Sequence, residues 1–222
     1  MIDNTSAFHS NEYDQKIRQT FPYYEEFYVQ VTELVKTAHT DPVSWLDVGC
    51  GTGMMGRAAF RNIPLERFVF MDSSEAMIRK TQERFLCPGA EFSVCDVRNL
   101  QYMNEFDVVT AIQVLHFLQA EERRSVIKRC LASLKENGLF ITFENIAPFT
   151  EIGKTVCLKK WGRFQLEQGK SIEETESHIA RYGKDYFPIT IEEHLKLMRE
   201  CGFKAVEMLW FSNTQAGFWA MK

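Results

Sequence analysis

Length, composition and charge set the first limits on this protein. The chain has 222 residues, 45% of them hydrophobic, which suffices for one domain with a full core and falls short of two comfortable ones. Its formal net charge is −4 and its sequence pI is near 5.8. No overall positive field is therefore available to attract a phosphate backbone, so we expect no nucleic-acid partner.

The first residues and the cysteines limit location and metal content. The stretch from Met1 to Ser10 is polar and lacks the basic-then-apolar order of a signal peptide, and no apolar run approaches the ~20 residues that span a bilayer. We therefore expect a cytoplasmic protein without a membrane segment. The six cysteines are scattered, with no Cys-x-x-Cys pair, so reduced thiols and no metal site are expected.

An amphipathic helix is predicted near the N-terminus. Apolar residues recur at helical spacing from Tyr24 to Ala38, Thr20 and Pro22 can open the helix, and Pro42 lies beyond its end. Short apolar runs then alternate with helical patterns, and five runs predict strands at 45–48, 68–71, 92–94, 108–112 and 139–143. This alternation is typical of a parallel α/β sheet, whose right-handed crossovers place helices on both faces.

The C-terminal third has a different pattern. Residues 147–188 are polar and mostly favour helix, with a capping box that starts at Ser171, and a second box at Thr190 opens a further helix. Two apolar runs, 206–211 and 216–221, are separated by a Ser-Asn-Thr turn. They predict a closing antiparallel hairpin.

The strongest chemical signal is the run from Asp47 to Gly53, where the first strand turns into a helix. Its glycines, Gly49, Gly51 and Gly53, permit positive φ and let the backbone approach a ligand closely. The spacing from Gly51 onward also satisfies the dinucleotide pattern G-x-G-x-x-G, with Asp72 about 20 residues further on. The glycines alone therefore do not decide between a dinucleotide and a different cofactor.

Three neighbouring features argue against a dinucleotide. An acidic residue, Asp47, precedes an additional glycine, and a carboxylate suits a cationic amino group better than a pyrophosphate, which it would repel. Asp96 and Val97 follow the third predicted strand, where a carboxylate can accept from an adenine amino group beside an apolar wall. A terminal hairpin is an uncommon end for a dehydrogenase.

At these residues the sequence resembles the class I S-adenosylmethionine (SAM)-dependent methyltransferases, from residue 45 onward. The resemblance implies a seven-stranded Rossmann-like α/β sheet, mostly parallel with an antiparallel C-terminal strand, and helices on both faces. It implies that the glycines line the methionine part of SAM, that Asp72 binds the ribose hydroxyls, and that Asp96 with Val97 meets adenine. Asp47 and Ser73, which follows Asp72, complete the expected cofactor contacts of this core.

The chain divides into four expected segments of a single methyltransferase domain. Residues 1–42 are N-terminal lid helices, 43–146 are the SAM-binding core, 147–188 are a helical insertion or cap, and 189–222 are a closing helix and hairpin.

The methyl acceptor is expected at the end of the fourth strand, because open α/β sheets bind ligands at the carboxyl edge. Gln113 and His116 lie there and are candidates for the reaction centre, and an imidazole could deprotonate an acceptor. For His116 a helix-start or core position is the alternative. Neither an N/D-P-P-aromatic nor a Pro-Cys motif is present here, which argues against base methylation. Glu144 and Asn145 end the fifth strand and either orient a polar acceptor or cap the following turn.

The aromatic N-terminal segment is the candidate lid. The family's Phe-x4-Tyr-Asp stretch, here Phe8 to Asp14, commonly folds over the cofactor, so the resemblance implies a role for Tyr13. It also implies that Arg18 lies near the methionine carboxylate, where a bidentate contact would fit. In the insertion, the cations between Lys154 and Lys170 form either a cap for an anionic acceptor or a solvated helix face, and the solvated face is favoured.

The combined prediction is a SAM-dependent methyltransferase that acts on a small molecule, as a monomer or homodimer, with no nucleic acid, membrane or metal. A dedicated base is optional, because methyl transfer from a sulfonium needs mainly alignment and exclusion of water. An NAD-linked oxidoreductase and a non-catalytic SAM-binding protein remain as alternatives.

Overall fold

The computed structural model describes residues 3–4 and 6–222 of the chain. Met1, Ile2 and Thr5, which belong to the polar N-terminal stretch considered above, lie outside the described residues.

The core is a seven-stranded sheet in the order β3-β2-β1-β4-β5-β7-β6. All five predicted core strands and both strands of the predicted hairpin are confirmed. Every pairing from β3 across to β5 is parallel, whereas β7 is antiparallel to both of its neighbours, β5 and β6. The strands are β1 (Val43–Val48), β2 (Leu65–Asp72), β3 (Ala90–Val94), β4 (Phe106–Ile112), β5 (Leu134–Asn145), β6 (Ala205–Ser212) and β7 (Gln215–Met221).

The strand order reverses between β1 and β4. The chain leaves β1 toward β2 and later returns to place β4 on the other side of β1, with Val48 paired to Ala111. The segments that follow β1 and β4 depart in opposite directions, so a crevice opens at their carboxyl ends. The glycine run after Val48 and the segment after Ile112 both reach this crevice.

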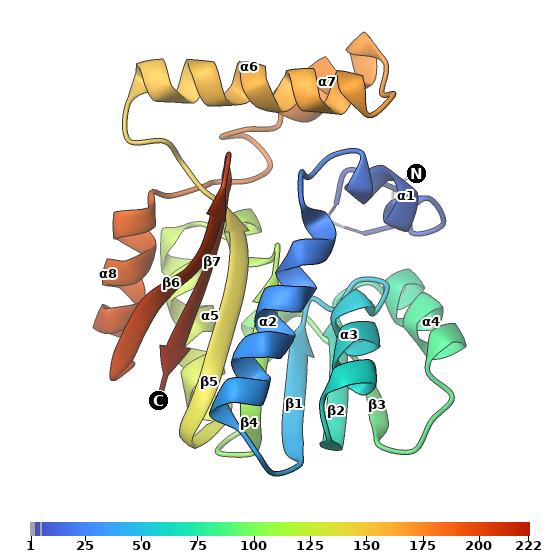
Figure 1. Cartoon of the computed structure of the whole chain (residues 1–222), viewed down its shortest axis with the longest axis vertical. Helices are drawn as coiled ribbons and strands as arrows, with labels where there is room; N and C mark the ends of the chain where they lie inside the picture. Colours follow the sequence, from blue (N-terminus) through green and yellow to red (C-terminus); the bar gives the residue numbers. More distant parts are fainter. Residues whose placement is uncertain (1–2, 5) are drawn as a thin grey trace.

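Helices cover both faces of the sheet, as predicted (Figure 1). One apolar core packs α2, α3 and α4 against one face, and a second core packs α5 and α8 against the other. The helices are α1 (Tyr13–Arg18), α2 (Tyr24–Ala38), α3 (Met54–Asn62), α4 (Glu75–Arg84), α5 (Ala120–Ser133), α6 (Glu151–Glu167), α7 (Ile172–Ile179) and α8 (Ile191–Cys201). Short 3-10 turns η1 (Val97–Asn99) and η2 (Leu115–Phe117) follow β3 and β4.

Local sequence signals account for most helix boundaries. The capping boxes at Ser171 and Thr190 are both present and open α7 and α8. The chain passes directly from α5 into β5: the helix ends at Ser133, and Gly138 lies inside the strand. A Cβ at Gly138 would lie 2.9 Å from the Lys135 carbonyl oxygen, so the glycine serves a tight bend in the strand.

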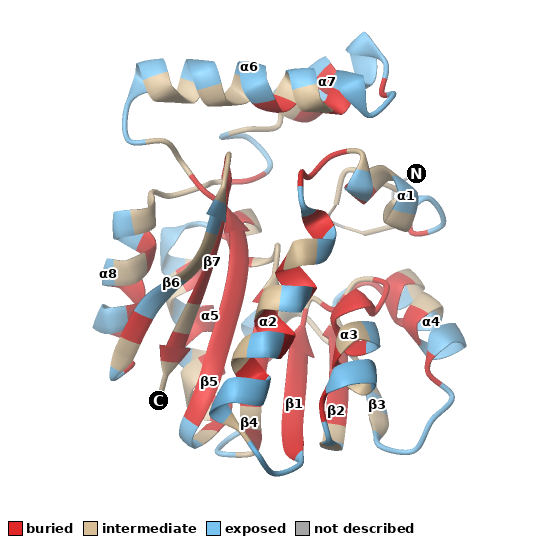
Figure 2. Cartoon of the chain, in the orientation of Figure 1, coloured by how far each residue is buried: buried red, intermediate tan, exposed pale blue. Residues whose placement is uncertain are grey.

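The α6–α7 segment lies across the carboxyl edge of the sheet, beside the α1 region (Figure 1). Much of α6 is solvent-exposed (Figure 2), and its buried residues are Trp161 and Gln165. The Trp161 ring nitrogen donates to the Thr20 carbonyl oxygen at 2.6 Å. The buried Lys170 ammonium donates to Thr20 Oγ1 at 2.6 Å and to Gln165 Oε1 at 2.8 Å. These contacts join the N-terminal segment to the α6–α7 segment.

Gly56 and Gly162 give a matched test of the packing on this sheet. A Cβ at Gly56 in α3 would overlap the ring of Phe70 on β2, so we expect Gly56→Ala to lower the free energy of unfolding by about 1–3 kcal/mol. In α6 the first atom that a Cβ at Gly162 would meet is 3.5 Å away, on Thr175. Gly162→Ala should therefore leave stability unchanged or raise it by up to ~1 kcal/mol. Urea unfolding of both variants checks this, and equal effects would contradict the packing described here.

Candidate functional site

A cleft of about 210 Å³ opens at the carboxyl edge where the strand order reverses. Eight of the predicted site residues line it: Tyr13, Gly49, Gly51, Asp72, Ser73, Asp96, Val97 and Gln113. The structure therefore brings together residues from the N-terminal segment and from the loops after β1, β2, β3 and β4. Ten further residues complete the lining: Asn4, Ser6, Met77, Cys95, Arg98, Ile112, Val114, Phe117, Leu118 and Glu122.

The glycines of the first loop have different surroundings. Gly49 and Gly51 have φ of +64° and +54°, and both line the cleft. A Cβ at Gly51 would project into open space, with the Tyr13 ring 4.0 Å away, so a ligand can approach this backbone closely. Gly53 instead faces α4, where a Cβ would lie 2.8 Å from Thr81 and 2.9 Å from Phe85. It allows close packing of the loop on that helix.

Asp72 ends β2 with its carboxylate held by backbone amides. Oδ2 accepts from the Gly51 amide at 2.9 Å, and Oδ1 accepts from the Ser74 amide at 2.8 Å. Burial raises the pKa of this carboxyl above its ordinary value, and the two amide hydrogen bonds oppose that shift. The carboxylate thus has a fixed orientation at the wall of the cleft.

Asp47 is buried beside a small cavity of about 20 Å³ that adjoins the glycine loop. Its Oδ1 accepts from the Thr110 hydroxyl at 2.7 Å, while Oδ2 has no hydrogen-bond partner in the part of the chain that the structure describes. Burial raises the pKa of Asp47 to about 7, against the Thr110 hydrogen bond and with a contribution from the charge of Asp72. Among the described residues, Asp47 Oδ2 therefore has neither a hydrogen-bond donor nor a cation beside it.

Gln113 lies where three cavities meet. It lines the main cleft, the cavity beside Asp47, and a third chamber described below. Its φ is +61°, an uncommon conformation for a residue with a side chain, often retained at functional sites. Its Nε2 donates to Gln215 Oε1 at 2.9 Å and to the Phe143 carbonyl oxygen at 3.2 Å, whereas Oε1 is unpartnered among the described residues.

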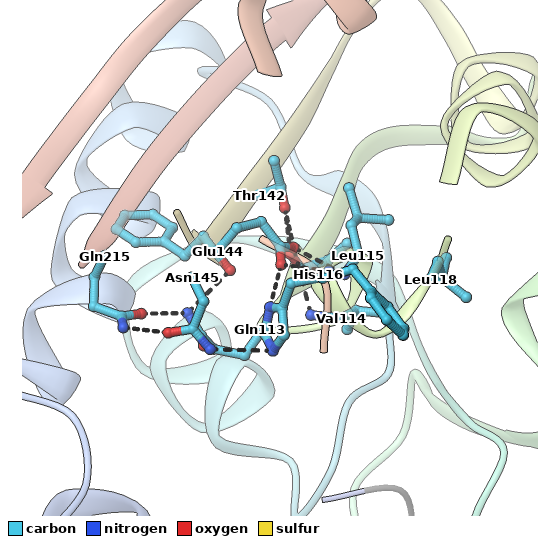
Figure 3. A network of polar contacts seen from close by, with 12 residues as sticks. Gln113, Val114, Leu115, His116, Leu118, Thr142, Glu144, Asn145 and Gln215 are labelled. Atoms are coloured by element: carbon cyan, nitrogen blue, oxygen red, sulfur yellow. Dashed lines mark hydrogen bonds and ion pairs between the residues drawn. The ribbon is translucent and has the colours of Figure 1, made fainter. Parts of the chain in front are cut away.

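A buried polar network connects to Gln113 (Figure 3). Glu144 accepts from the backbone amides of Leu115 and His116 at 3.0 Å each and from the Thr142 hydroxyl at 2.7 Å. Its Oε2 lies 2.6 Å from His116 Nδ1. Burial alone would raise the pKa of Glu144, but hydrogen bonding and charge from His116 dominate and lower it. Glu144 is therefore an ionised anchor in the core.

His116 has both ring nitrogens engaged. Nδ1 faces Glu144, and Nε2 lies 3.3 Å from Asn145 Nδ2. Asn145 in turn accepts from Gln215 Nε2 through Oδ1. This bonding favours a positioning role for His116 over that of a free proton acceptor.

The third chamber, of about 40 Å³, shares Ser6, Tyr13, Gln113 and Phe117 with the main cleft. Its remaining lining comes from the N-terminal segment, from the ends of β4 and β5, and from the segment around α7: Ala7, Phe8, Ile17, Phe21, His116, Asn145, His178, Arg181 and Tyr186. The chamber is thus a small, partly open extension of the cleft, lined by residues of the α1 and α7 segments.

Two buried polar side chains line this chamber without hydrogen-bond partners in the described part of the chain. Neither ring nitrogen of His178 nor the hydroxyl of Tyr186 has a hydrogen-bond partner among residues 3–4 and 6–222. Burial lowers the pKa of His178 to about 3, with help from the charges of Lys170 and Arg181, so the imidazole is neutral at neutral pH. His178 also stacks on Phe8, with ring centroids 5.8 Å apart.

One expected cofactor contact, Asp96, is already bonded to another side chain. Asp96 lines the cleft with Val97, but its carboxylate is bonded to Arg98, with Nε to Oδ1 at 2.9 Å and Nη2 to Oδ2 at 2.6 Å. The hydrogen bonds from Arg98 lower the pKa of Asp96. Arg98 also pairs with Glu122 at 3.0 Å. A ligand at this end would meet an ion-pair network.

Arg18 and the cations of the insertion lie elsewhere. Arg18 pairs with Glu25 at 2.6 Å on the exterior of α1. Lys159, Lys160 and Arg163 are exposed on α6, in agreement with a solvated helix face, whereas Lys170 is buried. No group of three or more His, Cys, Asp or Glu in the described part of the chain could hold a metal ion. None of the helices among the described residues has the length and apolar character needed to cross a membrane.

Sequence reasoning missed several lining residues. Asn4 and Ser6 lie in the polar N-terminal stretch, and His178, Arg181 and Tyr186 lie in the polar insertion. Their residue types carry no spacing signal for a site. The one available hint was the prediction that both segments form a cover, which would bring their polar residues to the same edge.

The sheet order, the glycine loop and the acidic residues after β1 and β2 define a class I, Rossmann-like SAM-dependent methyltransferase fold. A family model described as a methyltransferase domain matches residues 46–138. Among curated proteins, the carboxy-S-adenosyl-L-methionine synthase of Nautilia profundicola is 21% identical over 211 residues, covering 95% of this chain and 90% of that relative. The synthase of the same name from Helicobacter hepaticus is 23% identical over 205 residues, covering 89% and 85%.

A solved structure agrees at the level of the fold. The complex of the Haloferax volcanii Trm112 methyltransferase activator with a methyltransferase contains a chain that superposes with a TM-score of 0.70 at 13% identity, covering 100% of this chain and 98% of that one. The family model and the curated relatives support a SAM-dependent, methyltransferase-like enzyme with SAM as its cofactor or substrate, and the solved structure shows the same fold.

Asp47→Asn tests the buried carboxyl. Because the pKa of Asp47 is about 7 in the folded protein and near 3.8 when unfolded, its contribution to stability is fully present below about pH 4 and is lost as the pH rises toward 7. Asparagine does not titrate, so the stability of Asp47→Asn relative to the parent should increase between about pH 4 and pH 8. Urea unfolding at both pH values measures this difference. The same difference at both would contradict the elevated pKa.

Proposed function

We propose that the protein binds SAM in the main cleft and transfers its methyl group to the reactive end of a small molecule in the adjoining chamber. The observation that carries this proposal is the shared wall: Tyr13, Gln113 and Phe117 line both cavities, so ligands in the two would be in contact. The small volume of the chamber supports a small molecule as the acceptor.

The lining of the cleft fits SAM in this proposal. Asp47 Oδ2 and Gln113 Oε1 are unpartnered oxygens, as far as the described residues go, at one small cavity, where they would accept from the cofactor's ammonium group. Gly51 leaves room for its methionine part. Asp72, with Ser73 beside it, would accept from the ribose hydroxyls, and Val97 with Asp96 would meet adenine. The exterior pairing of Arg18 with Glu25 gives no support to its predicted contact with the methionine carboxylate.

Bound SAM supplies an electrophilic methyl group on a sulfonium, and the protein's task is to align the acceptor and exclude water. Phe8 and Tyr13 supply the cover from the N-terminal segment, and residues 147–188 supply it from the other side through His178. His116 is held by Glu144 and Asn145, so we assign it to positioning of the chamber wall. Residues 1–42 and 147–188 therefore act as lid and cap over the core 43–146.

The chamber favours a polar acceptor. His178 and Tyr186 offer neutral hydrogen-bonding groups that lack partners within the described chain, and Arg181, which pairs with Asp185 at 2.7 Å, also lies in the lining. Aromatic rings of Phe8, Phe21 and Phe117 form the remaining walls. A small molecule with a hydroxyl or carbonyl group and a negative charge would complete these contacts.

The test is a metabolite extract incubated with purified protein and SAM radiolabelled in its methyl group. Transfer of label to a small, extractable compound is expected. A lack of transfer from a protein that binds SAM, with label appearing neither in small molecules nor in SAM derivatives, would contradict the proposal.

A second candidate is the formation of carboxylated SAM, which the name of the relatives suggests. The size of the chamber supports it. Its volume of about 40 Å³ is a few times the ~10–15 Å³ that holds one water molecule, so it admits a group the size of a carboxyl. Arg181, which pairs with Asp185 at 2.7 Å, lies in its wall.

Mass spectrometry of the same incubation separates the two candidates. Replacement of a methyl hydrogen of SAM by a carboxyl group requires a carboxyl donor, which the extract supplies. A SAM derivative heavier by one CO₂ would select the second candidate, and a methylated metabolite with S-adenosylhomocysteine would select the first.

Asp72→Ala should weaken SAM binding by roughly 1–3 kcal/mol, because the ribose hydroxyls lose a charge-assisted acceptor. Asp107→Ala is a matched control, since Asp107 pairs with Lys135 and with the Ser44 amide at the opposite end of the sheet. Isothermal titration with SAM compares the two variants. Unchanged affinity in a folded Asp72→Ala protein would remove the ribose assignment.

Tyr186→Phe removes a buried hydroxyl that has no partner in the described free protein. We expect thermal stability to be unchanged or slightly higher, because an unsatisfied buried group is lost, while methyl transfer to the acceptor in the extract falls about tenfold. Tyr102→Phe, on the loop before β4, is the control for loss of a distant hydroxyl. Transfer that equals the parent's in Tyr186→Phe would show that the hydroxyl does not contact the acceptor.

A further inference from the structure

Five side chains form a continuous hydrogen-bonded chain along the carboxyl edge of the sheet (Figure 3). It runs from Glu144 to His116 at 2.6 Å, from His116 to Asn145 at 3.3 Å, on to Gln215, and from Gln215 to Gln113 at 2.9 Å. We call this set the edge relay. It connects β5, the turn after β4 and the first residue of β7 with the point where the cavities meet.

The orientation of each amide follows from the Phe143 carbonyl. A carbonyl oxygen only accepts, so Gln113 turns Nε2 toward it and toward Gln215 Oε1. Gln215 Nε2 then donates to Asn145 Oδ1, which leaves Asn145 Nδ2 facing His116 Nε2 at 3.3 Å. At the far end, the Glu144 carboxylate accepts from His116 Nδ1 and holds the ring. Each amide is thereby held in one of its two orientations.

The relay ends at the Gln113 oxygen. With Nε2 bonded to Gln215 and to the Phe143 carbonyl, the amide turns Oε1 away from both of these acceptors. The reversed amide would set this oxygen against two other oxygens, which is repulsive in a buried site. The observed orientation leaves an acceptor beside the free oxygen of Asp47.

We propose that Glu144, His116, Asn145 and Gln215 are positioning residues that hold the Gln113 amide with its oxygen toward the cofactor's ammonium group. The inference rests on the proposed function, since that function places the ammonium between Asp47 and Gln113. In this proposal the buried pair of Glu144 and His116, which has no direct access to the cleft, takes part in cofactor recognition. The closing hairpin takes part through Gln215.

The same substitution at Gln215 and at an exposed glutamine separates positioning from a general effect of the change. Gln215→Met removes the acceptor for Gln113 Nε2 and the donor to Asn145 Oδ1, whereas Gln101→Met makes the same change at an exposed residue. The probes are S-adenosylhomocysteine, which carries the ammonium, and 5′-methylthioadenosine, which lacks the amino-acid part. We expect Gln215→Met to bind S-adenosylhomocysteine about tenfold more weakly than the parent and 5′-methylthioadenosine equally well. Gln101→Met should stay within about threefold of the parent for both probes.

The outcomes are distinct. Equal affinity of parent and Gln215→Met for S-adenosylhomocysteine, or an equal loss for both probes, would overturn the relay while leaving SAM binding intact. A parent protein that binds neither probe would overturn the proposed function and the relay with it. If Gln215→Met does not fold, Asn145→Leu repeats the comparison one step earlier, because leucine removes the acceptor for Gln215 Nε2. The same difference between probes is expected, and its absence refutes the relay.

Discussion

The reversal of strand order between β1 and β4 is the constraint on which the rest of this structure depends. Neighbouring parallel strands end at one edge, and the chain leaves these two ends in opposite directions. The crevice between them cannot be filled by the sheet itself, so loops, the N-terminal segment and the α6–α7 segment determine what it contains. The glycine loop, Asp72, Gln113 and the edge relay all occupy positions that this reversal creates.

Three carboxyl groups lie along that edge, two of them buried and that of Asp72 half-buried, and their surroundings differ. Glu144 is surrounded by donors and is ionised although it is fully buried. Asp72 has two backbone amides and a raised pKa. Asp47 has one donor and a pKa of about 7. The incompletely solvated group is the one that a cation would stabilise most, because burying an unpaired charge is costly and pairing it recovers that cost.

The sequence predicted the strands, their order of appearance and the glycine loop, because these follow from hydrophobic period and from glycine spacing, which are local properties. It did not predict which charged groups pair. Arg18 joins Glu25, and Asp96 joins Arg98, because each finds a partner within a few residues. His178 lay in a stretch whose polarity gave no reason to expect a buried imidazole. Such choices depend on which distant segments come together, and a one-dimensional pattern does not contain that information.

The hydrogen bonds at Thr20 have a consequence for the order in which the structure forms during synthesis of the chain. Thr20 is bonded to Trp161 and Lys170, which the ribosome adds about 140 and 150 residues later, and Gln215 is added later still. During synthesis the N-terminal segment emerges first but has nothing to close against until the insertion has been made. A growing chain therefore passes through most of its length before the contacts that join the N-terminal segment to the α6–α7 segment can form.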